Sequence, residues 1–287
     1  MTDMSEAAGL HRYPLARRGL VMSGLISGFT LATTRVEAQV IHTDTEGLVA
    51  GETKIPTDNG DLPAYYARPA KGGAFPIVLV IEEIFGLHEH IRDLCRRLAK
   101  DGYLAVATEY YARIADLSKM TDVPTIMRDV IAKSSDGQMM HDMDATAAWA
   151  AKNKGSAAKL GVTGFCRNGR AAWLYAAHNP KLKAAVSWYG PVNTPDTDVQ
   201  PKSPLDIAGE LKCPLLGLYA GQDAGIKVDD VRAAQAKAKA AGKTVDVVVF
   251  PDAPHAFNAD YRPSYRATDA KIAWQLMLTW FKTYGVA

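Results

Sequence analysis

Continuous apolar runs alternate with amphipathic segments along most of the chain. The run 75–81 contains no charged residue, as expected for a strand that is covered on both faces. In the segment 87–100 apolar residues recur at helical spacing, and Asp101-Gly102 ends the pattern. Further strands are predicted at 104–108, 160–165, 184–188, 215–220 and 245–250, and further helices at 141–152, 168–178, 228–241 and 264–284. This alternation predicts an α/β fold, with a mainly parallel sheet and helices on both faces.

Two segments outside this alternation complete the predicted organisation. Residues 52–56 and 62–68 read as two strands around a turn at 58–61. The segment 189–211 is long and holds four prolines, so we expect a loop near the rim of the active site. No internal repeat, low-complexity tract or linker interrupts the chain, which predicts one domain over 39–287.

The first forty residues differ from the rest of the chain. Arg17-Arg18 precede a mildly apolar stretch that reaches Thr33, and small residues around Ala38 resemble a cleavage site. This layout predicts a twin-arginine type signal peptide over 1–38, and hence a periplasmic or exported protein. The stretch is too short and too rich in Gly, Ser and Thr to span a bilayer. We therefore expect no stable membrane association after processing; the alternative is a retained N-terminal extension on a cytoplasmic protein.

Composition and charge narrow the function classes. Hydrophobic residues make up 48% and charged residues 22%, the balance of a globular protein. A formal net charge of +2, with scattered Lys and Arg, argues against a nucleic-acid partner. The three cysteines cannot form a disulfide framework. His88, His90 and His141 lack the spacing of a zinc set and are interpreted as surface residues, so neither a metal nor a cofactor is expected.

A cysteine stands between a predicted strand and a predicted helix, in Gly164-Phe-Cys166-Arg-Asn168-Gly169. This is the nucleophile-elbow pattern with Cys in place of Ser. The N-terminus of the following helix favours a thiolate at this position. Asn168 stands where a second glycine is usual, and Asn tolerates unusual backbone angles better than most residues. A structural cysteine in a glycine-rich turn is the alternative.

Two further strand ends carry residues that complete a catalytic set. Asp223 follows one late strand and His255 follows the last one, and nucleophile, acid, histidine is the chain order of an α/β-hydrolase triad. In this interpretation Cys166 attacks the acyl carbon, His255 moves protons and Asp223 holds the imidazole in one tautomer. Asp252 and Asp260, which flank the histidine, are the alternative acids.

A carboxylate pair, Glu82-Glu83, follows the first buried strand. We expect this loop to supply an oxyanion donor, with the N–H of Ile84 joining that of Arg167. A carboxylate close to a cysteine can take the thiol proton or hold it in a resting state. We expect one of the two glutamates to be a solvated turn residue.

With these residues assembled, the chain resembles the dienelactone hydrolase family from about Gly51 to the C-terminus. The resemblance is carried by Glu83-Ile-Phe-Gly86, Tyr111-Ala-Arg113, Gly164-Phe-Cys166, Gly221-Gln-Asp223 and His255-Ala-Phe257. It implies the α/β-hydrolase fold and a Cys166–His255–Asp223 triad with Glu83 activating the cysteine. It further implies that Arg113, with Tyr111 beside it, binds a substrate carboxylate, and that the reaction opens an enol-lactone such as carboxymethylenebutenolide to a dicarboxylic keto acid.

Two departures from the family pattern leave the substrate open. Ala259 stands where the family has a second substrate-binding arginine, and Arg262 is the candidate replacement. Arg167 stands where a bulky apolar residue is common, which changes the charge of the pocket. A dienelactone-type hydrolase, a broader carboxylesterase acting on neutral esters, and a non-catalytic or redox-responsive protein are the three hypotheses. We expect a monomer or a small homo-oligomer with a small-molecule ester or lactone as its substrate.

Overall fold

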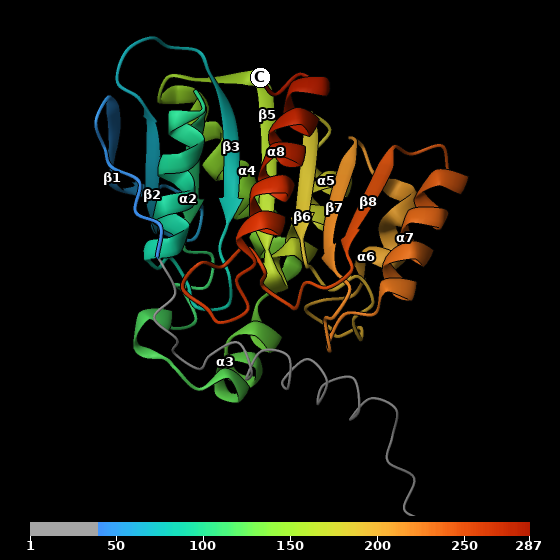
Figure 1. Cartoon of the computed structure of the whole chain (residues 1–287). Helices are drawn as coiled ribbons and strands as arrows, with labels where there is room; N and C mark the ends of the chain where they lie inside the picture. The colour runs from blue at the N-terminus through green and yellow to red at the C-terminus, as the bar shows by residue number, and fades with distance from the viewer. Residues whose placement is uncertain (1–39) are drawn as a thin grey trace, which may run out of the picture.

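An eight-stranded sheet runs through the centre of the protein (Figure 1). The structure is a computed structural model that describes residues 40–287, so the predicted signal peptide lies outside the described residues. The strand order is β1-β2-β4-β3-β5-β6-β7-β8. The strands are β1 (Leu48–Ile55), β2 (Leu62–Pro69), β3 (Phe75–Ile81), β4 (Leu104–Thr108), β5 (Gly155–Phe165), β6 (Ala184–Trp188), β7 (Leu215–Ala220) and β8 (Val245–Phe250).

Strands β3 to β8 are parallel, whereas β1 and β2 form an antiparallel hairpin whose second strand joins β4. The mainly parallel sheet predicted from the sequence is confirmed. The arrowheads of the parallel strands point to the lower edge in Figure 1, where the loops and α3 lie. In an open parallel sheet the ligand site lies beyond this edge.

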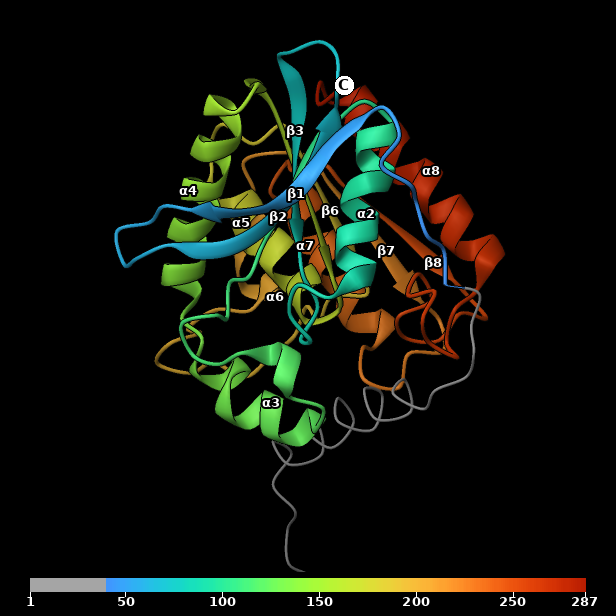
Figure 2. The ribbon, with the colours of Figure 1, turned by 90° about the vertical axis from the view of Figure 1, so that its left-hand side faces the viewer.

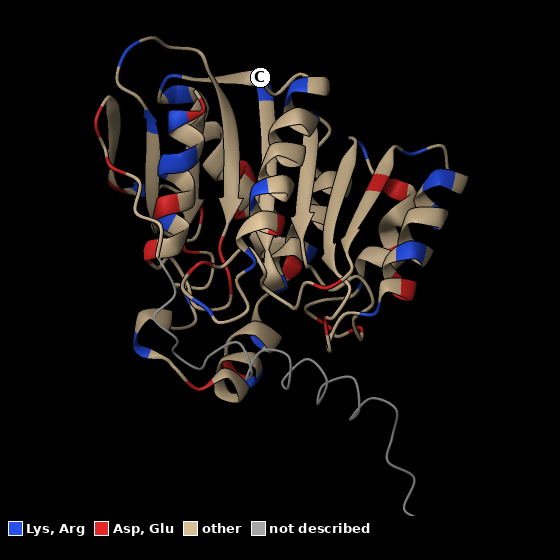
Figure 3. Cartoon of the chain, viewed as in Figure 1, with Lys and Arg blue, Asp and Glu red and all other residues tan. Residues whose placement is uncertain are grey.

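Helices cover both faces of the sheet, as predicted. Figure 2 shows α2 and α8 on one side and α4 and α5 on the other. Helix α7 packs against β8 and α6, and α6 contacts α5. The helices are α2 (Glu89–Lys100), α3 (Val123–Asp129), α4 (Asp136–Lys152), α5 (Gly169–His178), α6 (Pro204–Ile207), α7 (Val228–Ala240) and α8 (Ala267–Thr283). Lys and Arg are interspersed with Asp and Glu on the outer sides of these helices (Figure 3).

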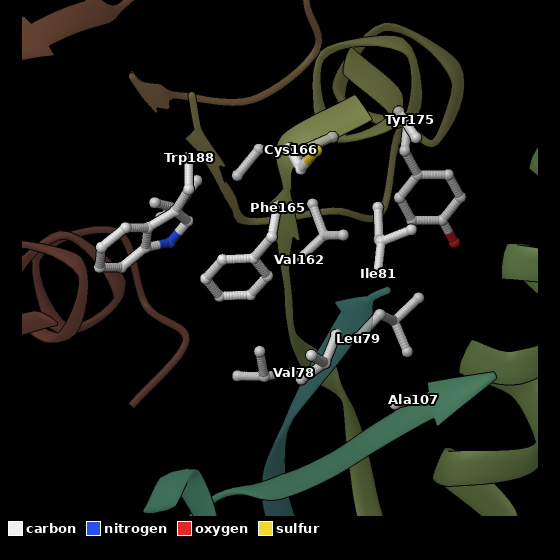
Figure 4. Close-up of a cluster of buried hydrophobic side chains, with 14 of the residues drawn as sticks. Val78, Leu79, Ile81, Ala107, Val162, Phe165, Cys166, Tyr175 and Trp188 are labelled. Atoms are coloured by element: carbon white, nitrogen blue, oxygen red, sulfur yellow. The ribbon is translucent and has the colours of Figure 1, made fainter. Parts of the chain in front are cut away.

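The core lies between the sheet and its two helical layers. Every residue of β4 and β6 is buried, and β3 is buried except for Pro76. Figure 4 shows Val162 beside Phe165, Val78 and Leu79 of β3 below them, and Cys166 directly after the end of β5. Each fully buried Val, Leu or Phe contributes roughly 1.5–3 kcal/mol. The strand that carries the cysteine is therefore held rigidly.

Several element boundaries differ from the prediction. Helix α4 starts at Asp136 instead of 141, because Ser135 caps it by accepting a hydrogen bond from the N–H of Gln138. Its polar first turn carries no apolar periodicity. Helix α3 was not predicted, and the proline-rich segment 189–211 contains the short α6. Among residues 40–287 no helix has the length and hydrophobicity needed to cross a bilayer.

Candidate active site

The turn after β5 projects Cys166 from the sheet. Cys166 has a left-handed backbone, with φ of 56°, which is uncommon for a residue that is not glycine. Close packing of the turn explains the neighbouring glycine, because a Cβ on Gly164 would lie 2.2 Å from the carbonyl oxygen of Asn168. Strained backbone of this kind is concentrated at functional sites. The nucleophile-elbow geometry predicted for this segment is therefore present.

The ends of three strands bring Cys166, His255 and Asp223 together. His255 Nε2 lies 3.4 Å from Cys166 Sγ, and His255 Nδ1 lies 2.6 Å from Asp223 Oδ2. The other carboxylate oxygen of Asp223 accepts hydrogen bonds from the N–H groups of Gly225 and Ile226 at 2.9 and 3.1 Å. The histidine and aspartate side chains are both buried. Their positions are fixed before any ligand arrives.

The surroundings of His255 favour its protonated form. Burial lowers its pKa, but the opposing effects of Asp223 and Cys166 outweigh burial and raise the pKa to about 10. The alternative acids take no part in this arrangement. Asp260 contacts His90 Nδ1 at 3.0 Å and Arg97 Nη2 at 2.5 Å, and Asp252 is exposed. The geometry therefore selects Asp223 as the carboxylate that orients His255.

The two glutamates after β3 are both buried, so the prediction that one is a solvated turn residue is wrong. Glu82 Oε1 accepts a hydrogen bond from the N–H of Tyr110 at 2.9 Å. Burial, with repulsion from Glu109, raises the pKa of Glu82 well above its usual value. Contacts between segments distant in sequence bury this loop, and no local pattern could show them.

Glu83 lies in a buried cluster with Tyr261, Arg262 and His88. Its Oε2 accepts a hydrogen bond from Tyr261 Oη at 2.5 Å, and Arg262 Nη2 and His88 Nε2 each lie 3.4 Å away. Burial raises the pKa of Glu83, but Arg262 and His88 outweigh burial and hold it well below its usual range. Glu83 is therefore ionised in this arrangement and is paired mainly with Arg262.

The histidines after this loop are not the surface residues predicted. His90 is buried against Asp260, and His88 is only partly exposed, with its ring 5.0 Å from that of Tyr261. His141 is exposed, as predicted. Among residues 40–287 no group of three His, Cys, Asp or Glu side chains could hold a metal ion. The rings of His88 and His90 instead lie 5.0 and 5.3 Å from the ring of Tyr261, which donates to Glu83.

The proposed oxyanion donors lie on two segments that an asparagine side chain connects. Asn168 Nδ2 donates to the carbonyl of Glu82 at 2.7 Å, and Tyr111 Oη donates to Asn168 Oδ1 at 2.6 Å. Ile84 is two residues from Glu82, and Arg167 precedes Asn168. The backbone at Asn168 is ordinary, with φ of −90°, so the expected unusual angle falls on Cys166 instead.

Three arginines near the site have different partners. Arg113 makes a two-pronged ion pair with Asp142, at 2.6 and 3.1 Å, and so anchors its loop to α4. Arg262 lies over the Phe85 ring at 4.9 Å, and its Nη1 is buried without a hydrogen-bond partner within residues 40–287. The buried Arg167 donates to Gln200 Oε1 at 2.7 Å. Of these three arginines, Arg262 has one donor atom without a partner within residues 40–287, and Arg167 has no ion pair there.

Arg167 contrasts with Arg170, one turn further along. Arg170 is neutralised by a two-pronged pair with Asp136, at 2.5 and 2.7 Å. For Arg167 we find a neutral amide as hydrogen-bond partner and no ion pair within the described part of the chain. Burial and the charge of Arg170 lower the pKa of Arg167 to about 10. Its charge increases the positive potential next to Cys166.

Tyr189 is a site residue that the sequence did not indicate. It follows β6 with a left-handed φ of 39°, and its ring lies edge-on to His255 at 5.2 Å. Its hydroxyl is buried and has no hydrogen-bond partner among residues 40–287. A tyrosine after a buried strand is usually part of the core, so only the packing around His255 reveals it.

Comparison with known proteins assigns the chain to a family. The model of the dienelactone hydrolase family matches residues 62–285. A provisionally named carboxymethylenebutenolidase of Methylorubrum extorquens is 52% identical over 275 residues, covering 95% of this chain and 94% of that protein. One from Escherichia coli K12 is 49% identical, covering 90% and 96%.

A solved structure with the same fold supports this assignment. The crystal structure of a provisionally named dienelactone hydrolase from Klebsiella pneumoniae has a TM-score of 0.81 and 51% identity. The aligned region covers 83% of this chain and 99% of the Klebsiella chain. The α/β-hydrolase fold predicted from the sequence is confirmed. The chain belongs to the dienelactone hydrolase family and is a hydrolase of esters or lactones.

Proposed function

We propose that this enzyme hydrolyses a small lactone or ester through a Cys166–His255–Asp223 triad. The observation that carries the proposal is the chain of contacts from Sγ through the imidazole to the carboxylate, at 3.4 and 2.6 Å. Nucleophile, base and orienting acid within such contact are the signature of covalent catalysis. With His255 Nε2 in contact with Sγ, the imidazole takes the thiol proton as Cys166 attacks.

The triad performs two acyl transfers. Cys166 Sγ bonds to the acyl carbon and the carbonyl π electrons move to oxygen; the C–O bond then breaks, and the leaving oxygen takes a proton from His255 Nε2. Water next attacks the thioester, gives its proton to His255, and releases the acid and the thiolate. In a lactone the leaving hydroxyl stays attached to the acyl group. The N–H groups of Ile84 and Arg167 stabilise the oxyanion formed in each step.

Glu83 and Arg262 form the charged wall of the proposed site. Because its pKa lies well below the usual range, Glu83 is a poor proton acceptor while paired with Arg262. His255 is therefore the base of each turnover, and Glu83 contributes a buried negative charge that is paired with Arg262. Arg262 Nη1, which has no hydrogen-bond partner within residues 40–287, offers a buried donor to a substrate carboxylate and so supports an anionic lactone as the substrate.

The names of relatives point to lactones. The Methylorubrum protein carries the name carboxymethylenebutenolidase, and a Bradyrhizobium relative, 28% identical, is named a probable 2-oxo-3-(5-oxofuran-2-ylidene)propanoate lactonase. A carboxylesterase acting on neutral esters is the second candidate. The observation that favours it is the pairing of Arg113 with Asp142, which occupies the arginine expected to bind the substrate carboxylate.

Replacing the nucleophile tests the proposal. Cys166→Ala should abolish hydrolysis of both an anionic lactone and a neutral ester while the melting temperature is kept. Iodoacetamide should label Cys166 and inactivate the enzyme in parallel. Cys95 and Cys213 serve as controls, because both are buried and burial raises their pKa values, that of Cys213 to about 12. Substantial turnover by Cys166→Ala would refute the nucleophile assignment.

The same panel separates the two candidate substrates. A dienelactone-type enzyme should prefer the anionic lactone in kcat/KM, and Arg262→Met should remove that preference. Losing a charge-assisted hydrogen bond costs about 1.5–3 kcal/mol, roughly ten- to a hundredfold. A general esterase would show no preference for the anion, and Arg262→Met would then change the turnover of both substrates equally.

A further inference from the structure

Asn168 stands at a position that the nucleophile-elbow pattern usually gives to glycine. Two properties could place an asparagine there: tolerance of a left-handed backbone, or a use for its side-chain amide. The backbone of Asn168 has φ of −90° and ψ of 1°, which any residue adopts. Backbone tolerance therefore does not explain this asparagine, and its amide remains as the reason.

The amide joins three segments that are distant in sequence. Its Nδ2 donates to the carbonyl of Glu82 after β3, at 2.7 Å, and its Oδ1 accepts from Tyr111 Oη after β4, at 2.6 Å. All three side chains are buried. Buried hydrogen bonds with both partners in place fix relative positions strongly, because breaking one leaves an unsatisfied polar group.

These connections end close to the two proposed oxyanion donors. Arg167 is the residue before Asn168, and Ile84 is two residues beyond Glu82. An oxyanion hole works only when both N–H groups are already aimed at one oxygen position. We propose that Asn168 is a positioning residue that holds the loop of Ile84 at its working distance from the N–H of Arg167. This inference rests on the proposed cysteine mechanism.

The elbow itself gives the connection a rigid base. A Cβ on Gly164 would lie 2.2 Å from the carbonyl oxygen of Asn168, so this residue is packed directly against β5. Gly169, the next residue, is packed as closely, since its Cβ would lie 2.7 Å from the Cα of Gly190. The loop after β3 is therefore the segment whose position depends on the amide of Asn168, together with the bonds from Tyr110 to Glu82 and from Tyr261 to Glu83.

Asn168→Ala tests the inference, because it removes both hydrogen bonds and leaves Cys166, His255 and Asp223 unchanged. Losing one oxyanion donor costs about 10²–10³ in kcat. A misplaced donor should cost less, so we expect kcat to fall about ten- to a hundredfold while KM stays within about twofold. Tyr111→Phe removes the bond to Oδ1 alone and should lose less.

Alkylation by iodoacetamide separates positioning from damage to the nucleophile. In this reaction Sγ bonds to carbon and iodide leaves, so no oxyanion forms. Asn168→Ala should therefore label Cys166 within about twofold of the wild-type rate. Asn179→Ala is the matched control for stability, since Asn179 is another asparagine with little exposure, on the far end of α5, bonded to Asp144 and Tyr175. It should lower the melting temperature and keep kcat.

Three results would overturn the inference: an unchanged kcat in Asn168→Ala, alkylation that falls in parallel with kcat, or an equal loss of kcat in Asn179→Ala. If Asn168→Ala does not fold, Asn168→Gly, which restores the usual residue of the elbow pattern, is measured in the same way. Failure of the proposed mechanism would look different. There, wild-type hydrolysis would survive Cys166→Ala, whatever Asn168 does.

Discussion

The ion pair between Arg113 and Asp142 makes the role of Arg113 testable. The resemblance to the family implies that Arg113 binds a substrate carboxylate, whereas its two bonds to Asp142 make it an anchor. Arg113→Met would leave the Asp142 carboxylate, which is 2% exposed, with its hydrogen bond from Gln138 at 3.0 Å. We expect this change to reduce stability and to leave the choice between anionic and neutral substrates unaltered.

The magnitude follows from the burial of the pair. Removing one partner of a buried ion pair costs about 3–5 kcal/mol. The Arg113 side chain is 25% exposed and Gln138 still serves the carboxylate, and both reduce the loss. The expected cost is therefore about 2–3 kcal/mol. At roughly 2–4 °C per kcal/mol for a domain of this size, the melting temperature should fall by roughly 4–12 °C.

Calorimetry combined with kcat/KM on an anionic lactone and a neutral ester decides between the two roles. Arg128→Met is the matched control, because Arg128 pairs with Asp129 at the surface, where such pairs contribute about 0–1 kcal/mol. Its melting temperature should hardly change. The anchoring role would be refuted if kcat/KM fell about ten- to a hundredfold for the anionic lactone alone while the melting temperature stayed unchanged. A loss of that size corresponds to about 1.5–3 kcal/mol and would indicate that Arg113 binds the substrate carboxylate.

Three further predictions concern charge and processing. The pKa of His255 is raised from 6.5 to about 10, so the contribution of its charge to stability is complete below pH 6.5 and is lost as the pH rises through about 10. The difference in melting temperature between wild type and His255→Gln, measured by calorimetry, should therefore shrink over that pH range. Arg167→Leu removes a buried charge beside the nucleophile and should lower kcat/KM for an anionic lactone relative to a neutral ester; an unchanged ratio would exclude an electrostatic role. We propose that residues 1–38 are an export signal, so intact-mass analysis of protein from its own host should find a chain that begins near Gln39, and finding the full chain would contradict export.

The sheet and the proximity of Cys166, His255 and Asp223 could be predicted because both follow from strand order. The apolar runs identify the parallel strands, and a parallel sheet brings their carboxyl ends to one edge. Residues at three strand ends, Cys166, Asp223 and His255, are for this reason close together although up to 89 residues separate them. Local pattern was sufficient because each residue lies within five positions of a strand that the pattern identifies.

Features that depend on long-range contacts could not be predicted. The first residues of β5, Gly155-Ser156, carry no strand signal and pair with β3 through a register shift at Pro76. His90 reads as a surface residue until its pairing with Asp260, 170 positions away, is known. The local sequence around Gly155 or around His90 does not indicate which distant residue each one pairs with. Propensity describes a residue and its neighbours, whereas burial of a polar side chain depends on what packs against it.

Long-range polar contacts also explain how the loops after β3 and β8 can form a rigid site. Asp260 bonds to His90 and to Arg97 of α2, so the loop that carries Arg262 is tied to a helix on the face of the sheet. The neighbouring Tyr261 then donates to Glu83, which ties that loop to the end of β3. Each bond would cost roughly 1–3 kcal/mol to leave unsatisfied in a buried setting. The polar contacts of these loops therefore supply the positional order that regular secondary structure supplies elsewhere, and within residues 40–287 they leave Arg262 Nη1 without a hydrogen-bond partner.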